Sequence, residues 1–483
     1  MRRIRAFALC LLLSLQPLPI EAEAAGRRDF TDSLSRAVPV AGLQDQRFRL
    51  RERMAHYLVP GVSVAIIDHC RIVDARGFGR SAGQGQRITP RTLFQAGSIS
   101  KTLTAVAALQ LVEQGTLSLD GDVRRSLTSW RLADSPLLQG GNVTLRALLS
   151  HTAGINQEGG VGYLRGAPLP TLSEILDGRP PANTSPIRVE NPPGAWRYSG
   201  GGYYIVQALM QDATGKDYPQ LMDRLIFSPL GLNDSTFSQP LERRRVSSAA
   251  RAVGPDGSPL EGGWRVNPEL AAGGLWTTPT DIAKLLIGVA RAVRGEDRSL
   301  LGPEMAGELM KRGPGNWGLG VDLGPAGPTR RLRHTGHNVG FVSEYVIYPD
   351  TCQGAVVMTN ADQGGWLASE ILRAIGDSYG WPDRMAAASQ TAITLTPSIE
   401  RRFVGTYRLR DFPTERFIIS RRASGLYWAR VGHVGRDLLP ESEGRLFSPD
   451  SQMVLEVDDP EVETAQILSL SFGGGRNVAL RVD

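Results

Sequence analysis

Apolar and polar residues near the start of the chain follow first a helical and then a strand-like period. Between Phe30 and Leu58 they alternate at helical spacing, until Pro60 and Gly61 interrupt the pattern. Two strand-like runs follow, Val62–Ile67 and Ile72–Gly77, with Asp68 and His69 near the turn between them. The pattern therefore predicts a helical segment followed by a β-hairpin.

A long helix and a second pair of strands occupy the rest of the first 385 residues. Apolar residues at helical spacing run from Ser98 to Val112, and Gly115 is well placed to end that helix. Strand character returns at Phe341–Tyr348 and Gly354–Asn360, and Leu367–Gly376 predicts a closing helix. Strands at both ends with helices and loops between them predict an α+β fold: an antiparallel sheet flanked by helices, with an insertion of helices and loops.

The last part of the chain has a different pattern. Residues 386–399 are small and polar, which is typical of a linker. Beyond them, short strand-like runs such as Phe417–Ser420, Leu426–Val431 and Met453–Val457 alternate with Gly, Asp and Pro. We therefore expect a main domain over residues 25–385, a linker over 386–399 and a small all-β barrel over 400–483.

The first 24 residues have the layout of a cleaved secretory signal. A basic start, Met1–Arg5, precedes an apolar run from Ala6 to Leu15 and a small-residue site at Ala22–Ala24. The apolar run is too short to span a bilayer, and no other stretch approaches eighteen apolar residues. The sequence predicts a mature chain that begins near Ala25, has no integral membrane segment and is periplasmic or secreted.

Composition and charge further narrow the class of protein. The chain has 483 residues, of which 41% are hydrophobic and 21% charged, so it can bury a sizeable core. The net charge of +5 is a small excess of 54 basic over 49 acidic residues, without clustered lysine and arginine. We expect no nucleic-acid partner.

Two cysteines, Cys70 and Cys352, belong to the predicted mature chain. Cys70 follows the first predicted strand and Cys352 precedes the last one, in a compartment where disulfides persist. If those strands pair antiparallel, the two cysteines meet at one end of the sheet. The sequence leaves open whether they form a disulfide or remain two separate buried thiols.

Ser98 and Lys101 lie three positions apart at the start of the predicted helix, so their side chains share one face. Serine is a poor nucleophile until a base takes its proton, and a lysine whose pKa is lowered by burial can do so. The start of a helix also offers backbone N–H groups to a developing oxyanion. The pair therefore indicates a nucleophile and its base.

Further motifs follow in order along the chain: Leu148–Gly154 (LLSHTAG), Pro193–Ser199 (PGAWRYS), Gly273–Thr277 (GGLWT) and His334–His337 (HTGH). With the residues around Ser98, they resemble the serine β-lactamase and penicillin-binding family, nearest its class C branch. The resemblance runs from about Phe30 to Gly380. It implies a hydrolase that forms an acyl-enzyme on Ser98.

The resemblance also implies roles for later residues. Tyr198 matches the tyrosine that exchanges protons with the serine, while Lys101 sustains the low pKa of that phenol. His334, Thr335 and Gly336 match the family's strand motif, and the backbone N–H groups of His337 and Ser98 would form the oxyanion hole.

Three residues depart from the family's pattern or lie outside its chemistry. Gly200 stands where the family usually has an asparagine that binds the substrate's amide, which weakens the expectation of β-lactam turnover. His334 stands where β-lactamases have lysine, and a histidine there favours a peptidase or an esterase. His151 is interpreted as structural.

The predicted function is an exported serine hydrolase, most simply a D,D-carboxypeptidase or D-stereospecific peptidase. Two alternatives stay open: a carboxylesterase or weak β-lactamase of the same fold, and a non-catalytic protein that binds penicillin or peptidoglycan. The expected substrate is a small molecule or peptide, namely a D-amino-acid peptide, an ester or a β-lactam. No cofactor is required, and His334 and His337 lack the neighbours that a metal site needs.

Overall fold

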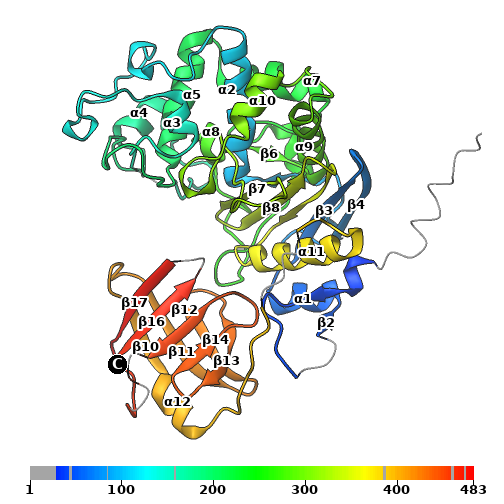
Figure 1. The fold of residues 1–483 in the computed structure, drawn as a ribbon, viewed down its shortest axis with the longest axis vertical. Coiled ribbons are helices and arrows are strands. Elements are labelled where there is room, and N and C mark those ends of the chain that lie inside the picture. Colours follow the sequence, from blue (N-terminus) through cyan, green and yellow to red (C-terminus); the bar gives the residue numbers. More distant parts are fainter. Residues whose placement is uncertain are drawn as a thin grey trace, which may run out of the picture.

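The computed structural model describes residues 29–42, 46–83, 85–156, 159–383, 388–457, 459, 462–472 and 475–483. The predicted signal peptide, residues 1–24, lies outside the described residues. Figure 1 shows two bodies, an upper one that contains an open sheet with helices on it and a lower one that is a barrel.

The upper body is built on a five-stranded antiparallel sheet with the order β4-β3-β9-β8-β7. Its strands come from both ends of the domain, as the sequence predicts: β3 (Gly61–Asp68), β4 (Arg71–Gly79), β7 (Leu332–Asn338), β8 (Phe341–Tyr348) and β9 (Gln353–Thr359). Strand β3 is buried along its whole length, because strands flank it and helices cover both of its faces. Strand β7 is an edge strand, so one side of its backbone is open to other groups.

Helices cover the two faces of this sheet. Helix α11 (Gly364–Tyr379) packs on β8 and β9, and α1 (Leu50–His56) packs beside it on the same side. Helix α9 (Pro279–Val293) packs on β3, β4 and β9. The rest of the insertion includes α2 (Ser100–Glu113), α3 (Leu145–Leu149), α4 (Leu172–Asp177), α5 (Gly200–Thr214), α6 (Tyr218–Met222), α7 (Ser228–Leu230), α8 (Leu270–Gly273), α10 (Pro303–Leu309) and the short strands β5 (Phe94–Gln95) and β6 (Trp276–Thr277). None of the described helices is both long and apolar enough to cross a membrane.

The lower body is a closed eight-stranded barrel, which confirms the predicted all-β unit. Its strands pair in chain order and the last pairs with the first: β10 (Gly405–Leu409), β11 (Arg416–Arg422), β12 (Gly425–Arg430), β13 (Arg436–Ser442), β14 (Arg445–Phe447), β15 (Val454–Val457), β16 (Ile467–Phe472) and β17 (Gly475–Arg481). Helix α12 (Pro397–Phe403) begins within the segment predicted as a linker. Its Ile399 and Phe403 are buried in the barrel core.

The helical prediction for Phe30–Leu58 is wrong over most of its length. Only α1 is an α-helix; before it come a 3-10 turn at Phe30–Asp32 and two short paired strands, β1 (Leu34–Ser35) and β2 (Arg47–Phe48). The apolar residues that suggested one helical face belong to two different cores. Leu34 packs in the sheet domain, whereas Val38 and Val40 pack against Phe447 of the barrel.

Cys70 and Cys352 form a disulfide. Strands β3 and β9 pair antiparallel with Ile67 opposite Gly354, so the turns that carry the two cysteines lie at the same end of the sheet. The antiparallel pairing that would bring the cysteines together is therefore present. The bridge joins residues that are 282 positions apart in the sequence.

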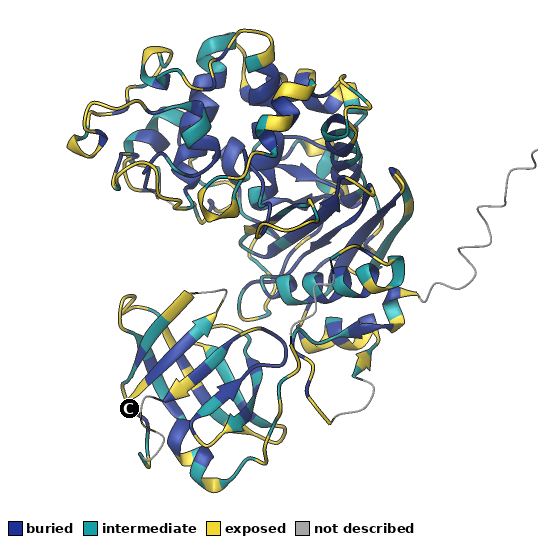
Figure 2. Cartoon of the chain, in the orientation of Figure 1, coloured by how far each residue is buried: buried dark blue, intermediate teal, exposed yellow. Residues whose placement is uncertain are grey.

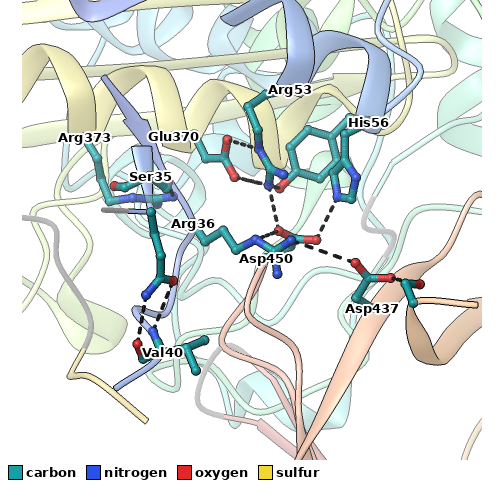
Figure 3. Close-up of polar contacts among 12 residues, drawn as sticks. Ser35, Arg36, Val40, Arg53, His56, Glu370, Arg373, Asp437 and Asp450 are labelled. Atoms are coloured by element: carbon teal, nitrogen blue, oxygen red, sulfur yellow. Dashed lines mark hydrogen bonds and ion pairs between the residues drawn. The ribbon is translucent and has the colours of Figure 1, made fainter. Parts of the chain in front are cut away.

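A buried ionic cluster connects the barrel to the sheet domain (Figure 3). Asp450, in the loop before β15, accepts hydrogen bonds from Arg53 at 2.6 Å and from His56 at 2.9 Å, both on α1. Arg53 also pairs with Glu370 of α11 at 2.6 Å. Because Asp450 and Glu370 share one arginine, a single guanidinium links the barrel to both helices on this face of the sheet.

The charges of this cluster determine the ionisation of Asp450. Burial alone would raise the pKa of this carboxyl, but the His56 hydrogen bond and the charges of Arg53 and Arg36 hold it well below its ordinary value. His56, Asp437 and Asp450 lie close enough to share a cation. The arginines already compensate the carboxylates, so ion pairing accounts for the cluster.

Replacing the shared acceptor, Asp450→Ala, is expected to lower the free energy of unfolding by about 3 kcal/mol, because a buried arginine loses one of its two counter-charges. The neighbouring Asp437 pairs with Arg36 at 3.9 Å and is partly exposed, so Asp437→Ala should cost about 0–1 kcal/mol. Urea unfolding of the two variants tests this difference. Equal losses would show that the Asp450 pair contributes no more than a surface ion pair.

Candidate active site

Ser98 lies in a tight turn between a short strand and a long helix. Strand β5 pairs with β6, and the chain then forms a 3-10 turn, Gly97–Ile99, that leads directly into α2. Gly97 has a φ of +51°, and a Cβ at this position would lie 2.5 Å from the backbone nitrogen of His337. The close approach of strand β7 therefore requires glycine immediately before the serine.

Lys101 is the second residue of α2, and its side chain is buried. Its amine donates to Ser98 Oγ at 3.0 Å and to the backbone carbonyl of Ala272 at 2.8 Å. The side chain is 1% exposed, whereas Ser98 is partly exposed. The pair predicted from the spacing is thus in contact, with the serine on the open side.

Burial lowers the pKa of Lys101 to about 7. The charged form of the amine is disfavoured because it has lost its water. A substantial share of Lys101 is then neutral near pH 7, with a lone pair that can take a proton from Ser98.

Tyr198 lies beside this pair, on the segment that enters α5. Lys101 Nζ is 5.1 Å from the centroid of the Tyr198 ring. The residues on either side of the tyrosine are held by one partner: the N–H of Arg197 donates to the His151 carbonyl at 2.9 Å, and the N–H of Ser199 donates to His151 Nδ1 at 3.2 Å. His151 therefore fixes the backbone on both sides of Tyr198.

His151 also supports the tyrosine through its ring. Its centroid is 4.3 Å from that of Tyr198, 5.3 Å from Trp317 and 5.5 Å from Tyr203. Burial, followed by the charge of Lys101, lowers its pKa well below the ordinary value, so the ring is neutral. These contacts favour the structural interpretation of His151.

Trp317 is a site residue that the sequence analysis missed. Its ring lies 5.9 Å from Tyr198 and 5.4 Å from His334, so it lies between the tyrosine segment and strand β7. It follows a glycine-rich turn without regular periodicity, and no local pattern distinguishes it from an ordinary packed aromatic. Only the fold shows its position.

The four residues predicted on the strand motif separate onto two faces of β7. His334 is 3% exposed and faces Tyr198, whereas the side chains of Thr335 and His337 are exposed. His337 Nε2 lies 2.6 Å from Asp362, in the turn before α11. Because side chains alternate along a strand, only His334 and the backbone of this motif face Ser98.

His334 is uncharged. Burial and then the charge of Lys101 lower its pKa to about 3. Its Nδ1 lies 2.6 Å from the Thr335 carbonyl, which makes Nδ1 the protonated nitrogen. Nε2 is buried without a hydrogen-bond partner in the described part of the chain. The residue thus offers an acceptor and no positive charge.

Strand β7 packs directly against the backbone of the Ser98 turn. A Cβ on Gly336 would collide with the Ala96 carbonyl and lie 3.1 Å from the backbone nitrogen of Ser98. Together with the contact between Gly97 and His337, this brings the backbone nitrogens of Ser98 and His337 side by side. Two adjacent N–H donors are what an oxyanion requires.

Gly200 begins α5, where three consecutive glycines are buried. A Cβ on Gly201 would lie 2.9 Å from the Asn156 carbonyl, so this helix start packs closely on the segment before it. With glycine at position 200, this first turn carries no side-chain amide to offer a substrate.

The sequence profile of the Beta-lactamase family matches residues 49–379. Penicillin-binding protein 4 of Amycolatopsis lactamdurans is 27% identical over 343 residues, which cover 66% of this chain and 86% of the relative. Esterase EstB of Burkholderia gladioli is 32% identical over 43% of this chain and 53% of its own length.

Solved structures share the fold. The octameric penicillin-binding protein homologue from Pyrococcus abyssi superposes with a TM-score of 0.58 at 23% identity, covering 89% of this chain and 98% of its own. SurE superposes with a TM-score of 0.54 at 22% identity, covering 90% and 97%. The family profile spans more than half of the chain, over the segment that carries Ser98, Lys101, Tyr198 and strand β7. The chain belongs to the Beta-lactamase family, a family of serine hydrolases.

Proposed function

We propose that this protein is an exported hydrolase that forms an acyl-enzyme on Ser98 and cleaves peptides of D-amino acids. The observation that carries the proposal is the 3.0 Å contact between Ser98 Oγ and the buried amine of Lys101. The basic, apolar and small-residue pattern of residues 1–24 supports export. The similarity to D-alanyl-D-alanine-carboxypeptidase/endopeptidase AmpH of Escherichia coli, 25% identical over 46% of this chain and 56% of its own length, supports the substrate class.

The proposed reaction has two halves. Ser98 Oγ attacks the substrate carbonyl while its proton passes to Lys101 or Tyr198, and the N–H groups of Ser98 and His337 stabilise the oxyanion. The carbonyl–nitrogen bond then breaks, and the leaving amine takes the proton. Water attacks the resulting ester, and Ser98 regains its proton when the acid is released.

Exposure to a penicillin tests the nucleophile. The intact mass of the mature protein is expected to rise by the mass of the penicillin, because lactam opening leaves no separate leaving group. Ser98→Ala is expected to show no increase. The same adduct on Ser98→Ala would place the reaction on another residue, whereas an unmodified wild type with unconsumed penicillin would favour the esterase or the non-catalytic alternative.

The pH dependence of kcat/KM tests the role of Lys101. Activity should rise as pH increases through about 7, since only the neutral amine accepts a proton, and fall about tenfold per pH unit well below that value. The pKa of His334 is lowered to about 3 and that of His151 also lies well below its ordinary value, so neither should titrate in this window.

Lys101→Arg provides the matched control for this profile. It keeps the positive charge but cannot lose a proton, so a loss of about 10²–10⁴-fold is expected. An unchanged rate in Lys101→Arg, or a wild-type profile that stays flat across pH 7, would remove Lys101 as the base.

A second candidate function is that of a carboxylesterase. A neutral His334 cannot pair with the terminal carboxylate of a D-Ala-D-Ala peptide, and Gly200 offers no side-chain amide to the acyl part of a peptide. Both features favour a substrate without a free carboxylate next to the scissile bond. The similarity to esterase EstB supports this candidate.

Short p-nitrophenyl esters and D-Ala-D-Ala peptides, assayed side by side, distinguish the two candidates. If the neutral His334 governs specificity, His334→Lys should raise kcat/KM for the carboxylate-bearing peptide about tenfold while leaving the ester rate equal or lower, since a charged hydrogen bond contributes about 1.5–3 kcal/mol. Wild-type turnover of the peptide at a higher kcat/KM than the ester would exclude the esterase as the main function.

A further inference from the structure

The open end of the barrel contains a cavity of about 460 Å³. Its walls come from five barrel strands (β10, β11, β12, β13 and β16), from the loops near their ends, and from Trp366 of α11 on the other body. Most of its lining is apolar and aromatic, notably Phe412, Phe417, Trp428, Met453, Leu470 and Phe472. A cavity of this size and lining lies in the range of small-molecule sites.

The interior of the barrel limits how deep an occupant can reach. Apolar side chains fill it, and Ile399 and Phe403 of α12 belong to the same core. An eight-stranded barrel is just wide enough to be filled by side chains or to hold one small ligand. The cavity can therefore hold one molecule at the mouth of the barrel, above the packed side chains of the barrel core.

A buried arginine lies in the wall of this cavity. Arg436, the first residue of β13, is 3% exposed, and its guanidinium lies on the face of Trp366. Within the described residues the Arg436 guanidinium donates a single hydrogen bond, to the Gly435 carbonyl at 3.4 Å, and no carboxylate forms an ion pair with it. Asp450, the nearby acid, is already bound by Arg53 and His56.

This arginine remains charged despite its burial. Loss of water lowers the pKa of Arg436 to about 10, which still leaves the guanidinium protonated near neutral pH. Asp450 attracts this charge from beyond ion-pair distance. A buried charge without a direct ion pair is costly, and an anion in the cavity would compensate it.

The rim of the cavity, like its wall, combines aromatic side chains with arginines. Phe412 is 56% exposed and Phe472 is 53% exposed, so two large aromatic side chains face solvent at the mouth. Arg416 and Arg430 also line it, and the acidic Glu415 is paired with Arg430. The surroundings thus attract an apolar body that carries a negative charge.

We propose that the barrel mouth binds one amphiphilic monocarboxylate, such as a medium-chain fatty acid, with its carboxylate on Arg436 and its chain among the aromatic side chains. The cavity borders a second cleft through Trp366, Ser451 and Phe472, which line both. That cleft reaches Thr335 and His337 on the face of β7 opposite to Ser98. The bound molecule would lie next to the active-site strand without entering the active site.

Calorimetric titration with decanoate tests the site in the full mature chain, with decanol as the uncharged match. Ser98→Ala serves as the background, so that reaction at the nucleophile is excluded and the result does not depend on the proposed hydrolysis. Decanoate is expected to bind with a stoichiometry of one and about tenfold more tightly than decanol. Trp366 and Trp428 line the cavity, so tryptophan fluorescence should change at the same concentrations.

Two variants separate the charge from the apolar contact. Arg436→Gln should weaken decanoate about tenfold, to the affinity of decanol, and leave decanol unchanged. Phe412→Ser, at an exposed position where folding is not at risk, removes the apolar contact without adding a charge and should weaken both ligands about tenfold. Circular dichroism checks that each variant is folded.

Three outcomes would each contradict a different part of the proposed site. No saturable binding of decanoate to the parent protein would eliminate the site. Equal affinities of decanoate and decanol in the parent would remove the role of Arg436. Full binding by Phe412→Ser would place the ligand elsewhere, whatever the fate of Arg436→Gln.

Discussion

The site depends on one electrostatic constraint: the amine of Lys101 is held in a position almost without water. Helix α2 carries it into the region between the sheet and the helical insertion, where its polar contacts include Ser98 and the Ala272 carbonyl. The two histidines near Lys101, His151 and His334, add no positive charge, because their pKa values lie far below the ordinary value for histidine. The aromatic contacts of Tyr198, His151 and Trp317 then exclude solvent from the same region.

Local patterns in the sequence predict much of this arrangement. The two hairpins, the helix after Ser98 and the barrel strands are signalled by residue alternation, which depends on which face of each element is buried. The Ser98–Lys101 contact follows from helical geometry alone. The sequence brought Cys70 and Cys352 together only on the condition that their strands pair antiparallel, and β3 and β9 do pair in that way.

Other features depend on contacts between distant segments, which no local pattern records. Val38 and Val40 have helical spacing with their neighbours but pack on the barrel, so the predicted helix is absent there. The charge state of His334 results from its burial, and Trp317 joins the site only because the fold places it between the Tyr198 segment and strand β7. Likewise, the sharing of Arg53 between Glu370 and Asp450 joins three segments that are far apart in sequence.

The order of the sheet has a consequence for biosynthesis. Three of its five strands, β7, β8 and β9, lie between residues 332 and 359, yet β9 is the inner neighbour of the first hairpin. While the chain grows, β3 has no partner on that side until most of the domain has been synthesised, and the backbone nitrogen of His337 cannot reach Ser98 before then. A chain that stops early would carry the nucleophile and its lysine but no completed site, so an incomplete product should have no hydrolytic activity.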